Sequence, residues 1–92
     1  MTLIDALSNW TQLKLVVNSR PNDEAAIISL DHVADILKEE FEIVPTSLEK
    51  VEALYLVTFN EKGVEKTQTF PAQVAETLLQ FINENPDRYE FK

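Results

Sequence analysis

The residues best suited to chemistry surround the single histidine, His32. Asp31, Asp35 and Glu39 lie one, three and seven positions from it, and side chains three or four residues apart share one face of a helix. Such a face offers the nitrogen and oxygen ligands that divalent metals prefer. One helix alone rarely supplies a closed coordination shell. The favoured interpretation is therefore a capped helix start with a solvated acidic face, and no metal site is predicted.

Other kinds of catalytic chemistry also lack the residues that they need. General acid–base work by His32 requires a second positioned group, and the sequence shows none. A phosphate-cradling loop needs several glycines, and the chain has one. Without cysteine, disulfides and zinc sites built on thiolates are excluded. No serine has the small neighbours of a strand–elbow–helix turn; the serines are Ser8, Ser19, Ser29 and Ser47. We predict no catalytic residue, no cofactor and no enzyme activity.

Acidic residues dominate the charged surface. The formal net charge is −8, which disfavours nucleic-acid phosphates and anionic membranes and favours a basic partner. Seven carboxylates lie between residues 31 and 52: Asp31, Asp35, Glu39, Glu40, Glu42, Glu49 and Glu52. Three interpretations fit these carboxylates: a docking face for a basic partner, an imitation of nucleic-acid phosphates, or an ordinary solvated helix face. Of these, Glu39, Glu40 and Glu42 are predicted to bind a partner.

The bulk composition predicts one small globular domain. The chain has 92 residues, of which 45% are hydrophobic and 26% charged, too few for two independent cores. Residues 1–10 lack the basic region of a signal peptide, and no apolar run is long enough to span a membrane. We therefore expect a cytoplasmic protein without membrane contact.

An apparent internal repeat predicts the elements that position these residues. A shift of 41 positions aligns residues 13–37 with residues 54–78 without a gap and gives seven identities in 25 positions. Alternating apolar residues at 13–17 and an apolar run at 25–30 predict two strands. Residues 51–59 and 64–70, joined by a turn that contains the only glycine, predict two more. Apolar residues at helical spacing predict helices at 31–42 and 71–84.

Together these elements predict an α+β fold, a two-layer sandwich built on a duplicated ββα unit. A first short helix precedes the two halves, 13–42 and 54–84, of a single domain 1–92. The element order is thus αββαββα, with a four-stranded, mostly antiparallel sheet and two helices on one face. This order is similar to that of the pterin carbinolamine dehydratase-like fold. That family carries a paired-histidine-proline motif, which this chain lacks, so the resemblance implies no catalytic residue here.

A competing interpretation replaces the first two strands with helix. Ile27, Leu30, Ala34, Leu37 and Phe41 recur at spacings of three and four, so residues 22–41 also fit one long helix. Leu3, Leu7, Trp10 and Val17 fit a helix through residue 18, and Thr46 with Glu49 fits a capping box. Three helices before a hairpin is a winged-helix layout. The repeat and the alternation at 13–17 favour the strands.

The third predicted strand carries the most informative surface. Leu54 and Leu56 alternate with Tyr55, Val57 and Phe59, so one of the two sets lies on the sheet face that the helices leave uncovered. The repeat places Tyr55, Val57 and Phe59 there, and the other register places the leucines there. An exposed apolar face usually marks an interface, unless the first helix or the C-terminal tail covers it. We expect a small acidic regulatory domain that binds a protein partner or forms a homodimer. The alternative is a nucleic-acid mimic or a winged-helix transcriptional regulator.

Overall fold

The computed structural model describes residues 2–84. Two long helices begin the chain: α1, Leu3–Ser19, and α2, Glu24–Phe41. Thr2 caps α1 in a capping box, in which its side chain accepts from the Asp5 amide and the Asp5 carboxylate accepts from the Thr2 amide. Asp23 caps α2 by accepting from the amide of Ala26 at 3.1 Å. Glu42, in the left-handed conformation, ends α2.

A three-stranded antiparallel sheet follows directly. Its strands are β1, Ile43–Val51, β2, Leu54–Glu61, and β3, Val64–Pro71, in the order β1-β2-β3. Both turns contain two residues. In the second turn Lys62 and Gly63 have φ of 53° and 86°, which is the conformation of a type I′ hairpin turn and explains the position of the only glycine.

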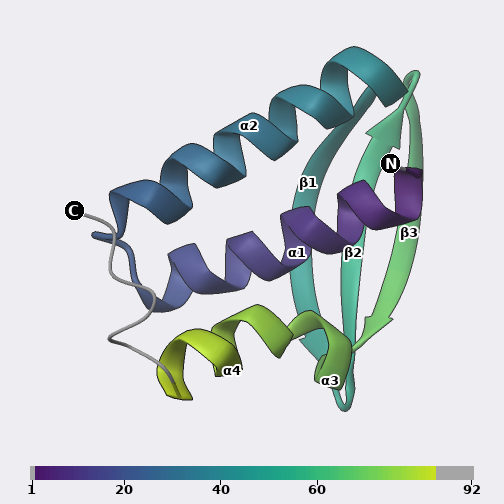
Figure 1. Ribbon diagram of the computed structural model, residues 1–92. Coiled ribbons are helices and arrows are strands. Elements are labelled where there is room, and N and C mark those ends of the chain that lie inside the picture. Colours follow the sequence, from purple (N-terminus) through teal and green to yellow (C-terminus); the bar gives the residue numbers. More distant parts are fainter. Residues whose placement is uncertain (1, 85–92) are drawn as a thin grey trace.

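Two short helices, α3 (Ala72–Ala75) and α4 (Thr77–Glu84), complete the described residues. Figure 1 shows all the helices on one side of the sheet, with α1 and α2 side by side and extending beyond the strands. No helix among residues 2–84 is long and apolar enough to cross a membrane.

The core lies between the sheet and the N-terminal half of α1. Ala6, Leu7 and Trp10 of α1 pack with residues from α2, the three strands and α3. A second, smaller cluster lies where the helices extend beyond the sheet, and it consists of Val16, Ala26 and Ile82. Thr11, also buried, satisfies its hydroxyl by donating to the Leu7 carbonyl at 2.8 Å.

The predicted α+β class is confirmed, but the duplicated ββα unit and the fourth strand are wrong. Residues 13–17 continue α1, and residues 25–30 belong to α2. The buried residues of α1 include Leu7, Thr11 and Val16, and their spacing follows a helical period. The alternation at 13–17 covers only five residues and is weaker evidence than this longer helical pattern. Residues 43–50, for which no strand was predicted, belong to β1.

The competing interpretation was right for the first two helices and wrong for the third. The long helix runs from Glu24 to Phe41, within the range 22–41 that this interpretation gives. The residues at the Thr46–Glu49 capping pattern lie in β1, so the layout is not three helices before a hairpin. The predicted helix at 71–84 is present but divided, because α3 ends before Glu76 and α4 begins after it.

Candidate functional site

The predicted apolar site residues of β2 lie in the core. Tyr55, Val57 and Phe59 are 7%, 0% and 5% exposed and face the helices. Leu54 and Leu56 therefore occupy the opposite side of β2, in the second of the two registers that the sequence left open. Tyr55, Val57 and Phe59 are not available on the surface to a partner.

The side of the sheet turned away from the helices carries a compact apolar patch. Cross-strand partners share a face. Leu54 pairs with Val51 on one side and with Pro71 on the other. Val51 is 46% and Leu54 44% exposed, Pro71 is exposed, and Leu56 is half-buried. We call Val51, Leu54, Leu56 and Pro71 the apolar patch, and the side of the sheet that carries it the open face.

The charges on the open face are all negative. Glu49 lies opposite Leu56, and Glu65 lies opposite Asn60, so both carboxylates project on the same side as the apolar patch. The strands contain two basic residues, Lys50 and Lys66, and their register places both on the helix side. Among the described strand residues, none on the open face is basic.

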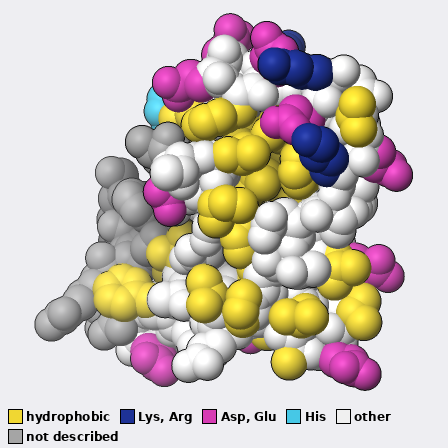
Figure 2. Space-filling view, turned by 90° about the vertical axis from the view of Figure 1, so that its right-hand side faces the viewer, with side chains coloured by type: hydrophobic (Ala, Val, Ile, Leu, Met, Phe, Trp, Pro, Cys, Tyr) yellow, Lys and Arg dark blue, Asp and Glu magenta, His cyan; other side chains and the backbone are white. Residues whose placement is uncertain are grey.

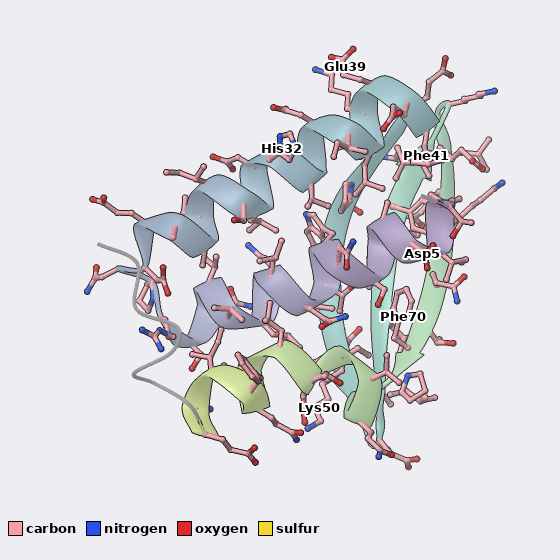
Figure 3. All side chains as sticks on the ribbon, viewed as in Figure 1. Asp5, His32, Glu39, Phe41, Lys50 and Phe70 are labelled. Carbon is pink, nitrogen blue, oxygen red and sulfur yellow. The ribbon has the colours of Figure 1, made fainter. Side chains whose placement is uncertain are left out.

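Each of those two lysines also forms an ion pair with an acidic residue. Lys50 Nζ lies 3.2 Å from the carboxylate of Glu76, which separates α3 from α4, and Figure 3 shows Lys50 beside the short helices. Lys66 donates to the carboxylate of Glu61 across the hairpin. Each lysine is therefore held by an acid of its own chain.

The three predicted acidic residues lie elsewhere on the molecule. Glu39, Glu40 and Glu42 are all exposed, at the end of α2. Figure 3 shows Glu39 on the side of α2 that points away from α1. The carboxylate of Glu42 lies 4.0 Å from Lys62 Nζ. The structure does not bring this acidic group together with Tyr55, Val57 and Phe59.

The best-defined polar cluster joins α3 and α4 to the sheet. The Tyr55 hydroxyl donates to the Glu76 carboxylate at 2.5 Å, and Lys50 lies 5.5 Å from the centre of the Tyr55 ring. Burial, together with the nearby Glu76 carboxylate, raises the pKa of Tyr55 to about 12. The hydrogen bonds from Tyr55 and Lys50 lower the pKa of Glu76. A neutral phenol bound to an ionised acid fastens two elements and does not supply a base.

That cluster was missed because its members are distant in sequence. Glu76 lies 21 residues from Tyr55 and 26 from Lys50, and neither separation corresponds to a helical or strand period. His32, the single histidine of the sequence, is exposed on α2. Within residues 2–84, no three His, Cys, Asp or Glu side chains are arranged to hold a metal ion.

Comparison with known proteins identifies no relative. No family model, curated protein or solved structure matches this chain.

Proposed function

We propose that this protein is a non-catalytic binding domain whose open face takes a basic protein partner. The observation that supports this proposal is the apolar patch, flanked by the Glu49 and Glu65 carboxylates on a face without basic strand residues. An apolar area held in water costs about 25 cal/mol per Å², so a partner that covers it gains free energy.

Charge distinguishes a basic partner from a homodimer built on the same face. Two open faces stacked on each other would bring acids against acids, on chains that each carry −8. Like charges placed opposite each other oppose association. A partner that presents an apolar ridge with Lys or Arg at its margin meets both features of the face. The patch supplies the buried centre of such an interface and the carboxylates supply its rim.

Point substitutions in the patch test the proposal. Tagged wild-type protein and a Leu54→Ser variant are used to capture proteins from an extract of the native cell. A protein with a net positive charge should be retained at low salt by wild type and at least tenfold less by Leu54→Ser. Ile28→Ser is the matched control, because Ile28 is 68% exposed on α2, away from the open face. This control should retain the partner fully.

Measurements with the purified partner then locate the contact. Calorimetry should give an affinity that falls as salt rises, because the rim charges are screened. The methyl resonances of Leu54, Leu56 and Val51 should shift on binding, whereas that of Ile28 should not. Capture that is equal for wild type and Leu54→Ser, or methyl shifts confined to α2, would contradict the proposal.

A further inference from the structure

The two edges of the sheet differ in whether they can accept another strand. The β1 edge contains Pro45, which has no backbone N–H, and its register with β2 slips between Pro45 and Ser47. Proline and bulges are devices that protect natural sheet edges. β3 pairs with β2 without a slip from Val64 to Pro71, with proline only at its last position. In Figure 2, which faces the β3 side of Figure 1, this part of the surface is in view.

The hairpin register shows which β3 backbone groups point outward. In a two-residue hairpin the flanking residues, here Glu61 and Val64, form a hydrogen-bonded pair. Alternation then directs the backbone of Lys66, Gln68 and Phe70 toward β2. The N–H and C=O groups of Glu65, Thr67 and Thr69 consequently point away from the sheet. The Thr69 carbonyl accepts from the side chain of its neighbour Gln68 at 3.0 Å, as expected of an outward carbonyl.

We infer that this edge pairs with the β3 edge of a second copy of the chain. Antiparallel pairing with Thr67 opposite Thr67 brings Glu65 opposite Thr69 on both sides of the two-fold axis. Every outward N–H of these residues then meets an outward carbonyl. The result is a continuous six-stranded sheet. Both open faces lie on the same side of that sheet, so neither apolar patch is covered by the pairing.

The charges along β3 are compatible with this register. Glu65 faces a neutral threonine, and Lys66, already paired with its own Glu61, faces Gln68 of the second copy. Val64 faces Phe70, whose side chain is buried in its own core. No like charges are directly opposite. The remaining repulsion comes from the net charge of −8 on each chain, so added salt should strengthen the pairing. This dependence is the reverse of that expected for a basic partner on the open face.

Cysteine crosslinking tests the pairing directly, because the chain has no native cysteine. Across a hydrogen-bonded antiparallel pair the Cα atoms are about 5.5 Å apart, within disulfide range. Mild oxidation of Thr67→Cys should therefore give a covalent dimer, in a yield that rises with salt. Ser47→Cys, an exposed position of β1 on the other edge, is the control for random collisions. Equal yields for the two variants would overturn the inference.

Two charge variants at one position test the register in the uncrosslinked protein. Thr69→Lys places a cation opposite Glu65 of the second copy and should lower the dimer dissociation constant about fivefold. Thr69→Glu should raise it by a similar factor. Gln80→Lys and Gln80→Glu make the same changes of net charge on the exposed side of α4, and they measure the general effect of charge. Light scattering or sedimentation at high salt provides the dissociation constants.

The edge pairing and the proposed function can each be refuted without the other. If wild type stays monomeric at high salt and Thr67→Cys does not crosslink, the edge pairing is refuted, whatever the open face binds. If Thr67→Cys crosslinks but Leu54→Ser captures the same proteins as wild type, the pairing stands and the proposed function is refuted.

Thr67→Pro, which removes the outward N–H, should abolish the dimer, whereas Thr67→Val, which keeps that N–H, should not.

Discussion

Replacing Tyr55 by phenylalanine should destabilise the protein by about 1.5 kcal/mol. The variant keeps the ring in the core and its contact with Lys50, and it removes only the hydroxyl that donates to Glu76 at 2.5 Å. A hydrogen bond to a charged group contributes about 1.5–3 kcal/mol. The lower end applies because the Glu76 side chain is 25% exposed and keeps Lys50 at 3.2 Å. For a domain of this size the melting temperature should fall by about 6–12 °C.

A double-mutant cycle with Glu76→Ala isolates this interaction. Urea denaturation followed by the fluorescence of Trp10 gives the free energies of unfolding of wild type, the two single variants and the double variant. If the hydrogen bond accounts for the loss, Tyr55→Phe should cost much less once Glu76 is absent. A coupling energy below about 0.5 kcal/mol would refute the assignment of Tyr55 and Glu76 as the fastening of α3 and α4.

The same pair makes the stability of the fold depend on pH. The pKa of Tyr55 is raised to about 12, so its contribution is complete below the unfolded pKa of 10 and is lost as the pH rises to about 12. The pKa of Glu76 is lowered, so its contribution is present above the unfolded pKa and is lost as the pH falls through the folded value. Tyr55→Phe should therefore reduce the loss of stability above pH 10 in a denaturation series.

Four further substitutions test the fold. Leu37→Ala, at a side chain that is fully buried, should cost about 2–5 kcal/mol in urea denaturation, whereas Ile28→Ala on the exposed side of the same helix should change the free energy of unfolding by less than about 0.5 kcal/mol. Gly63→Ala should cost about 1 kcal/mol from its φ of +86° alone, because an added Cβ would meet nothing within 4 Å. Thr11→Ala should cost about 1–3 kcal/mol, since it removes a buried hydroxyl and its bond to Leu7 and leaves a small cavity.

Local signals predicted one hairpin and the helical segment that follows it. A turn that contains the only glycine, between strand-forming residues 51–59 and 64–70, predicts two strands, and the structure has β2 from Leu54 to Glu61 and β3 from Val64 to Pro71. A turn depends only on neighbouring residues, so the sequence is sufficient to predict one here. The apolar residues after Pro71 likewise predict helix, although not the interruption at Glu76.

The N-terminal half shows why a short alternation is weak evidence. Five residues at 13–17 fit a strand, but they also continue the helical spacing of Leu7, Trp10 and Thr11, and burial follows the helix. The apparent repeat matched a segment of α1 to β2, and the identities between them were of common apolar residues. Pro45 lies within β1. Proline disrupts a helix or a central strand, but β1 is an edge strand, and its register with β2 slips next to that proline.

The sequence leaves open which side of β2 faces the helices, because both alternating sets of residues are apolar. The structure places Tyr55, Val57 and Phe59 inside, in the same core cluster as Leu7 and Trp10 of α1. Leu54 and Leu56 are left on the open face. Tertiary packing therefore determines which side of β2 forms the candidate surface. The same packing brings Tyr55 to Glu76.

The two proposals together predict how the protein engages its partner. Pairing of the β3 edges places two apolar patches on one side of a single sheet, at fixed positions related by a two-fold axis. A partner fixed densely on a surface can then contact both patches at once, and the second contact is intramolecular, which multiplies the apparent affinity. Thr67→Pro should therefore weaken retention on such a surface while leaving the affinity for the free, monovalent partner unchanged. An equal loss in both assays would mean that the outer edge of β3 at Thr67, and not only the open face, contacts the partner, and would contradict the separation of edge and face argued above.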